Sequence, residues 1–350
     1  MSECLEISGK RIGLGYPVLI VAEMSANHNQ NFDEAVKIIH AAKECGADAI
    51  KLQTYTPDTI TVDSDEEWFK IKGTIWEGET LYNLYSKAYT PWEWQPKLKK
   101  IADELGIILF SSPFDKSSVD FLELMEVPVY KIASFELVDI PLIEYISSKG
   151  KPVIMSTGMA SLNEMSEAIE AARGAGAKEL ALLKCTSAYP APTGEMNLRA
   201  IPNLAEAFNV VTGISDHTLS MVVPVASVAV GACIIEKHFT LSRRKQSADS
   251  AFSLEPDEFN AMVQSVRTTE KALGEVKYAV GKEEASSRVF RRSLFVVKDI
   301  KAEEVFTKEN VRSIRPGFGL SPKYLKDVLG NTAQIDIKRG TPLSWELIDK

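Results

Sequence analysis

The sequence predicts an α/β fold in which eight parallel strands close into a (β/α)8 barrel, a TIM barrel, followed by a small C-terminal domain. Three observations support this prediction. Short apolar runs alternate with amphipathic stretches eight times between residues 18 and 274. The apolar runs are nearly continuous, as expected of strands buried on both faces of a parallel sheet. Every run ends in polar or ionisable residues, and barrel active sites lie at these strand ends.

The individual elements follow in order. The first strand, 18–25, precedes an amphipathic helix over residues 32–45, which Gly46 ends. The other strands are expected at residues 49–54, 107–112, 129–134, 153–157, 180–186, 210–215 and 233–238. Their helices are expected at residues 92–105, 119–125, 142–148, 163–173, 198–208, 222–230 and 256–273. Residues 55–90 form an irregular insertion rich in Trp and Tyr. An open doubly wound sheet is the alternative fold, but it usually has fewer units, and no G-x-G-x-x-G follows the first strand.

The pattern changes after Gly274. Residues 1–275 are expected to form the barrel domain, and the charged, patternless residues 276–290 a linker. Residues 291–350 hold short strand-like runs at 293–297, 300–304 and 335–343 without a long amphipathic helix. A domain of this size is marginally stable unless it docks on another surface.

Composition narrows the function classes. The formal net charge of −8 argues against general binding to nucleic acid or to an anionic membrane. No apolar run reaches the roughly 20 residues of a membrane-spanning helix, and residues 1–15 contain no signal-peptide core. The four cysteines are scattered and form no C-x-x-C motif, which favours reduced thiols. We therefore expect a soluble, cytoplasmic protein.

Ionisable residues at the strand ends indicate the chemistry. Two of the four histidines, His217 and His238, end neighbouring strands, where two neutral imidazoles can converge on one divalent metal. Lys51, Lys131 and Lys184 end three other strands beside several hydroxyl residues. Lysines supply point charge and hydroxyls short donors, so a phosphate or carboxylate ligand is expected beside the histidines.

Several motifs resemble the sialic acid synthase family over nearly the whole chain. They are Glu23-Met-Ser-Ala-Asn-His-Asn-Gln, Lys51-Leu-Gln-Thr-Tyr, Ser112-Pro-Phe-Asp, Lys131-Ile-Ala-Ser, Ser156-Thr-Gly-Met, Cys185-Thr-Ser-Ala-Tyr-Pro, Gly213-Ile-Ser-Asp-His-Thr and Glu236-Lys-His-Phe-Thr. The tail, with Arg315-Pro-Gly-Phe-Gly and Lys338-Arg-Gly-Thr-Pro-Leu, resembles the family's antifreeze-like (SAF) domain. The insertion, with Lys72-Gly-Thr-Ile-Trp-Glu-Gly, resembles the pseudaminic branch.

The resemblance implies a reaction and a set of site residues. The family condenses phosphoenolpyruvate with an open-chain N-acetylated amino sugar, and the acceptor of the pseudaminic branch is a 6-deoxy-2,4-diacetamido hexose of altro configuration. His217 and His238 would bind the metal, typically Mn²⁺, with Mg²⁺ or Co²⁺ as alternatives. The residues implied to hold phosphoenolpyruvate are Lys51, Ser112, Lys131, Ser134, Ser156, Ser187 and Ser215. Glu23, Gln53, Tyr189 and Asp249 would face the sugar and the water, with Arg315 supplied by the tail of a partner in a homodimer. Glu23, Lys131 and the two histidines are the expected catalytic residues.

The sequence departs from the sialic acid branch at two places. That branch has Asn where Ser187 stands, and its sugar-contacting Asn has no clear counterpart near Gly73 and Thr74. The first departure concerns the phosphate contacts, which a serine can still make. The second argues against N-acetylmannosamine as the acceptor. N-acetylneuraminic and legionaminic acid synthases remain alternatives within the family. Two further alternatives are a Schiff-base aldolase that uses Lys184 or Lys131 and needs no metal, and a non-catalytic sugar-binding protein.

Overall fold

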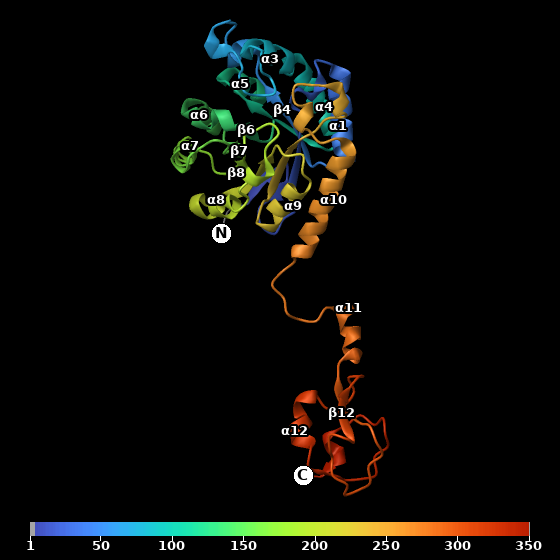
Figure 1. The fold of residues 1–350 in the computed structure, drawn as a ribbon. Coiled ribbons are helices and arrows are strands. Elements are labelled where there is room, and N and C mark those ends of the chain that lie inside the picture. The colour runs from blue at the N-terminus through green and yellow to red at the C-terminus, as the bar shows by residue number, and fades with distance from the viewer. Residues whose placement is uncertain (1–3, 350) are drawn as a thin grey trace. The chain divides into compact units, whose positions relative to one another are not determined.

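The computed structural model describes residues 4–349 of the 350-residue chain. The chain divides into two compact units, Met1–Gly274 and Glu275–Lys350 (Figure 1).

The first unit is a closed barrel of eight parallel strands surrounded by helices, so the predicted fold class is confirmed (Figure 1). Each strand pairs with its neighbour in the sequence, and β10 pairs with β3 to close the barrel. All eight ends lie within two residues of their predicted positions. The strands are β3 (Leu19–Glu23), β4 (Ala49–Thr54), β5 (Ile108–Pro113), β6 (Tyr130–Ile132), β7 (Val153–Ser156), β8 (Leu180–Cys185), β9 (Val211–Asp216) and β10 (Ile234–His238).

The covering helices follow the expected pattern. They are α1 (Phe32–Glu44), α4 (Gln95–Leu105), α5 (Lys116–Leu124), α6 (Ile140–Ser147), α7 (Leu162–Gly174), α8 (Ala200–Phe208), α9 (Val222–Ala229) and α10 (Pro256–Leu273). In α1, the Asn31 side chain accepts a hydrogen bond from the Glu34 amide and caps the first turn. Gly46 follows the helix with a φ of 87°, which glycine adopts without a steric penalty.

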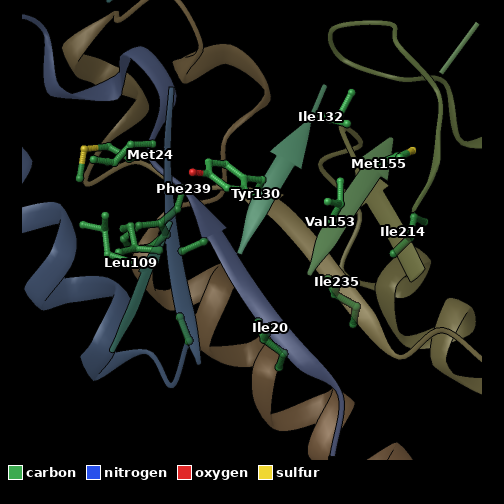
Figure 2. Packing of buried hydrophobic residues seen from close by; sticks show 14 of the residues in the cluster. Ile20, Met24, Leu109, Tyr130, Ile132, Val153, Met155, Ile214, Ile235 and Phe239 are labelled. Carbon is green, nitrogen blue, oxygen red and sulfur yellow. The ribbon is translucent and has the colours of Figure 1, made fainter. Parts of the chain in front are cut away.

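Strand alternation creates two apolar layers. In β3, Ile20 points outward to the layer between strands and helices, whereas Leu19 and Val21 point into the barrel. Figure 2 shows the outer layer, in which Ile20, Ile214 and Ile235 project from their strands. Inward-pointing apolar residues fill only the lower part of the barrel, which leaves its upper end for polar groups.

A short N-terminal hairpin seals the lower end of the barrel, a feature that the sequence analysis did not predict. It consists of β1 (Leu5–Ile7) and β2 (Lys10–Ile12). Leu5, Ile7 and Ile12 are buried in the same cluster as the first residues of the barrel strands. The site is therefore confined to the opposite end, where the strands terminate, which we call the mouth.

The insertion after β4 is more regular than expected. It contains α2 (Pro57–Ile60), a 3-10 turn η2 (Glu67–Phe69) and α3 (Leu81–Ala88). Residues 70–80 form an antiparallel loop whose two ends pair, with the Ile71 amide donating to the Glu79 carbonyl at 2.9 Å. Toward the start of α4, Trp92 stacks on Phe121 with ring centroids 4.7 Å apart, as core residues do.

The second unit has its own small core and two short antiparallel ladders. β11 (Ser293–Val296) pairs with β12 (Val311–Ile314), and β13 (Thr332–Ala333) pairs with β14 (Ile348–Asp349). The run predicted at 293–297 is β11, but those at 300–304 and 335–343 form only isolated bridges, such as Ile300 with Ile337. The predicted linker, 276–290, contains α11 (Lys282–Ala285) and the 3-10 turn η8 (Ser286–Phe290).

Two further expectations concern the chain as a whole. All four cysteines are free; Cys45, Cys185 and Cys233 are buried, and Cys4 is exposed. Between residues 4 and 349, no helix combines the length and apolar character that crossing a membrane requires.

Candidate active site

The mouth gathers side chains from strands that lie on opposite sides of the barrel. Glu236 on β10 lies 3.7 Å from the Lys51 ammonium on β4 and 3.8 Å from the Lys131 ammonium on β6. Lys51 also pairs with Glu23 on β3 at 2.7 Å. Contacts between such distant strands are possible only through the lumen, so all four charged groups point inward. Their side chains are nearly fully buried.

This cluster balances two ammonium groups against two carboxylates. Burial raises the pKa of Glu23 to about 7, because the opposing effect of Lys51 is not large enough to offset desolvation and Glu236 adds repulsion. Lys131 and Lys51 outweigh the burial of Glu236 and lower its pKa. Of these two carboxylates, Glu23 is therefore the one whose pKa lies near neutral pH. Gln53 fixes its orientation by donating to Oε1 at 3.0 Å.

Hydroxyl groups from three consecutive strand ends form an anion cradle, which we define as Ser134, Ser156, Gly158 and Ser187 around Lys131. The Lys131 ammonium donates to Ser156 Oγ at 2.7 Å, and the Gly158 amide donates to Ser134 Oγ at 3.1 Å. A Cβ atom on Gly158 would lie 2.1 Å from Ser187 Oγ and 2.7 Å from Ser134 Oγ. Glycine is thus required for the hydroxyls to approach this stretch of backbone.

Replacing Gly158 with alanine is expected to weaken binding of inorganic phosphate by about tenfold, because displacing one or two hydroxyl donors costs about 1–2 kcal/mol. The melting temperature should change little, since the displaced atoms end flexible side chains. Gly174→Ala is the matched control, because nothing lies within 4 Å of its added methyl group. Calorimetric titration with phosphate reads the difference; equal affinities for both variants would remove Gly158 from the cradle.

Two further predicted residues complete this side of the mouth. The Lys51 ammonium lies 3.4 Å from Ser112 Oγ, and Ser215 Oγ donates to Glu236 at 3.2 Å. Lys184, in contrast, points away from the lumen and donates to the Cys185 carbonyl at 2.7 Å and to Thr186 Oγ1 at 3.3 Å. Of the lysines considered for a Schiff base, Lys131 alone is in the lumen.

The two histidines lie beside the charged cluster. The ring centroids of His217 and His238 are 5.3 Å apart, and both side chains are buried. Nδ1 of His217 is 3.1 Å from the Thr186 carbonyl oxygen, which can only accept, so Nδ1 carries a proton and Nε2 is the nitrogen that could bind a metal. Burial lowers the pKa of His217, but Cys185 and the Thr186 carbonyl raise it further, so a metal at Nε2 would displace a proton. Nδ1 of His238 is buried and has no hydrogen-bond partner among residues 4–349.

These features fit a divalent cation held by two imidazoles. Burial, the neighbouring His217 and the lysines keep the pKa of His238 well below its ordinary value, so His238 is neutral, as a ligand must be. Within the same described range, no cluster of three or more His, Cys, Asp and Glu side chains is arranged to hold a metal. Two histidines alone would leave several coordination positions open for a substrate.

Aromatic side chains line the other side of the mouth and form what we call the aromatic wall: Trp76, Tyr189 and Phe252. The ring of Tyr189 lies 4.5 Å from that of His217 and 5.0 Å from that of Phe252. Trp76 comes from the 70–80 segment of the insertion, with its ring 5.7 Å from Tyr189 and its indole N–H donating to the Ala248 carbonyl at 2.9 Å. Next to this wall, the buried carboxylate of Asp249 accepts from the Ala26 amide at 3.3 Å.

Four residues at the mouth were assigned no role from the sequence, although Glu236 was recognised at its strand end beside His238. Gly158 and Phe252 have been described, and Glu236 sits two residues before His238, a spacing that places both on one face of β10. Glu136 lies in the 3-10 turn η4 (Ser134–Val138) after β6. Burial raises its pKa to about 7, and its Oε2 has no partner among residues 4–349.

The predicted site residue Arg315 is not part of the barrel. It belongs to the second unit, where its side chain is exposed.

Comparisons with known proteins identify the family of each part of the chain. The model of the NeuB family matches residues 38–278, and that of the SAF domain matches residues 291–349. A pseudaminic acid synthase of Campylobacter jejuni (strain 81-176) is 48% identical over 326 residues, covering 93% of this chain and 95% of its own. One from Helicobacter pylori is 44% identical over 335 residues, covering 95% and 98%.

A solved structure is similar over its full length. The spore coat polysaccharide biosynthesis protein spsE of Bacillus subtilis superposes with a TM-score of 0.66 at 32% identity, covering 99% of both chains. The expected family and the antifreeze-like tail are therefore confirmed. The chain belongs to the NeuB family and carries a SAF domain at its C-terminal end.

Proposed function

We propose that this chain is a pseudaminic acid synthase. It condenses phosphoenolpyruvate with open-chain 2,4-diacetamido-2,4,6-trideoxy-altrose and water, and it releases phosphate and a nine-carbon 3-deoxy-ulosonic acid. One observation carries the proposal: a lysine-bearing anion cradle and a pair of buried histidines share a single barrel mouth. The names of the Campylobacter and Helicobacter relatives support the choice of acceptor.

The anion cradle would bind phosphoenolpyruvate. Its phosphate and carboxylate carry charge that Lys51 and Lys131 neutralise, while Ser134, Ser156 and Ser187 donate short hydrogen bonds. The Gly158 amide is a further donor because its hydrogen bond to Ser134 can be exchanged for one to the ligand. Ser112 and Ser215 extend the same surface through their contacts with Lys51 and Glu236.

The acceptor would lie between the cradle and the aromatic wall. A 6-deoxy sugar ends in a methyl group, and Trp76 and Phe252 offer apolar surface for it. Gln53, Tyr189 and Asp249 provide polar groups for the hydroxyls and acetamido groups. This arrangement orients the aldehyde carbon toward the enol carbon of phosphoenolpyruvate, which is the main requirement for reaction between the two.

The reaction forms a carbon–carbon bond and a carbon–oxygen bond from C2 to water, and it breaks the carbon–oxygen bond from C2 to the phosphate. C3 of phosphoenolpyruvate attacks the aldehyde carbon, and the aldehyde oxygen takes a proton to become a hydroxyl. C2 then carries positive character and is attacked by water, whose proton passes to the Glu23 carboxylate. The new C2 hydroxyl gives its proton to the departing phosphate as the C2–O bond breaks, which leaves a ketone at C2 and phosphate with the bridging oxygen. With a pKa of about 7, Glu23 can both accept and return that proton.

A divalent cation, Mn²⁺ with Mg²⁺ or Co²⁺ as alternatives, would bind His217 and His238 and supply Lewis acidity for the aldehyde. The neutral His238 and the Nε2 atom of His217 support this part of the proposal. A Schiff-base reaction would instead need a deprotonated Lys131. Burial lowers the pKa of Lys131 and Glu236 opposes that shift, so trapping with borohydride in the presence of substrate separates this reaction from the metal-dependent one.

The acceptor is tested by comparing kcat/KM for a panel of altro-, legionaminic- and mannose-type N-acetyl sugars. We expect the 2,4-diacetamido-2,4,6-trideoxy-altrose to exceed N-acetylmannosamine by at least about tenfold, the usual discrimination from one apolar contact. Phosphate release that requires both substrates is the readout. Preference for N-acetylmannosamine would refute the pseudaminic assignment and leave the synthase reaction standing.

We further propose that the enzyme works as a homodimer in which the SAF domain of one chain covers the mouth of its partner. Exposed apolar side chains follow three strands at the mouth: Phe135, Val138, Met159, Leu162 and Val222. The charges are complementary, because residues 275–350 hold 15 Lys and Arg against 11 Asp and Glu, whereas residues 1–274 hold 25 against 37. In this arrangement Arg315 would reach the acetamido groups of the bound sugar.

A further inference from the structure

A buried ion pair lies directly behind the two histidines. Lys237 and Asp216 face each other on β10 and β9, one residue from His238 and His217. Because strand residues alternate, the histidines point into the lumen and the ion pair points out toward the helices. The Lys237 ammonium is 2.6 Å from Asp216 Oδ2, and neither side chain is exposed at all.

The pair also holds the backbone around His217. Asp216 Oδ1 accepts from the Thr218 amide at 2.8 Å, and Oδ2 accepts from Thr218 Oγ1 at 3.2 Å. The Lys237 ammonium donates to the Thr218 carbonyl. The residues on both sides of His217 are thereby tied to β10, the strand that carries His238.

Stability alone does not account for this arrangement. Removing two charges from water costs several kcal/mol per ion, and apolar residues of similar volume often replace such pairs without loss of stability. The surrounding layer is apolar: Ile214 and Ile235, two residues before Asp216 and Lys237 on the same faces of their strands, belong to it. A pair with fixed geometry does, however, set the relative position of the two strand ends more narrowly than apolar contacts would.

The ring of His238 lacks the hydrogen bond that usually orients a ligand histidine, so its position depends more on the backbone that the ion pair holds. Such a histidine commonly donates its second ring nitrogen to an oxygen that orients the ring. His217 has the Thr186 carbonyl in this role, whereas Nδ1 of His238 has no partner among the described residues 4–349. The orientation of His238 therefore rests on its backbone and on packing against Phe252, whose ring centroid is 4.8 Å away.

We propose that Asp216 and Lys237 act as a strut, a pair of positioning residues that holds His217 and His238 at metal-binding separation. This inference rests on the proposed two-histidine metal site. The strut makes no contact with substrate; it acts through the backbone of the two histidines.

The test compares single and double variants that remove the charges. Lys237→Met alone leaves a buried carboxylate unpaired, and Asp216→Asn alone leaves a buried ammonium, so both should lower the melting temperature. The double variant, Asp216→Asn with Lys237→Met, should regain most of that stability. Its affinity for Mn²⁺, measured by calorimetric titration of the metal-free protein, should nevertheless stay about 10–100-fold below wild type. Recovery of affinity together with stability would show that the pair is merely structural.

A matched control removes an ion pair at the other end of the barrel. Arg267 on α10 lies 2.7 Å from Asp48, just before β4. Asp48→Asn with Arg267→Met should change stability without changing Mn²⁺ affinity. An equal loss of affinity in this control would overturn the strut.

A separate experiment shows whether the two-histidine metal site, rather than the strut, is wrong. If His217→Ala leaves Mn²⁺ binding by the otherwise wild-type protein intact, the two-histidine proposal is wrong. The strut is then judged by a metal-free crystal structure of the double variant alone. Displaced or disordered histidine rings would support it, and rings that keep their 5.3 Å separation would contradict it.

Discussion

Replacing His217 or His238 with alanine is expected to lower kcat by at least about 10³-fold, because losing Lewis-acid assistance costs several kcal/mol of transition-state stabilisation. Chelation should abolish turnover in the wild-type enzyme, and added Mn²⁺ should restore it. The barrel should remain folded, since both side chains lie at strand ends above the apolar core. Steady-state phosphate release and circular dichroism measure the two effects.

The control for this experiment is His40→Ala. His40 is exposed on α1, away from the strand ends, and its replacement should leave turnover unchanged. Full activity in an enzyme stripped of metal would contradict the role assigned to the histidine pair.

Mixing an Arg315→Ala chain with a His217→Ala chain is expected to restore activity that neither variant has alone. Mixed dimers would contain one good site, made from the intact barrel of the first chain and the intact tail of the second. With random exchange, activity should approach about a quarter of wild type, because half of the dimers are mixed and each has one working site. Arginine supplies rigid donors to a carbonyl group, so alanine cannot replace it.

The complementation is interpretable only if the subunits exchange, which differently tagged chains reveal by co-purification. Arg312→Ala, an exposed arginine three residues earlier at β12, is the matched variant and should keep its activity. Exchange without recovery would mean that each tail serves its own barrel or that Arg315 has no role in the site.

The barrel could be predicted from the sequence because each of its strands is marked by a short run of neighbouring apolar residues. Apolar runs of five or six residues identify the strands, and parallel closure brings their carboxyl ends together, so Glu23, Lys51, Lys131 and His238 could be assigned to one mouth. The N-terminal hairpin also has a local signal in its sequence, the turn dipeptide Ser8-Gly9. In the structure, Ser8 and Gly9 have φ values of 50° and 76° and join two three-residue strands, as in a tight hairpin turn.

Other parts of the site depend on contacts between distant segments. Gly158 matters because two serines from neighbouring loops, Ser134 and Ser187, converge on it, and no pattern in its own segment reveals this. Phe252 joins Tyr189 and Trp76 only after the chain has folded. In the second unit, strands of two to four residues are too short for periodicity to locate them.

The most direct test of the account is a single incubation in ¹⁸O-labelled water with phosphoenolpyruvate, the diacetamido altrose sugar and Mn²⁺. Mass spectrometry then follows the phosphate and the sugar product. We expect one phosphate per sugar consumed, free of ¹⁸O because water attacks C2 and the bridging oxygen leaves with phosphorus, together with a nine-carbon acid. Phosphate that carries ¹⁸O, or phosphate released at the same rate without the sugar, would contradict the proposed condensation.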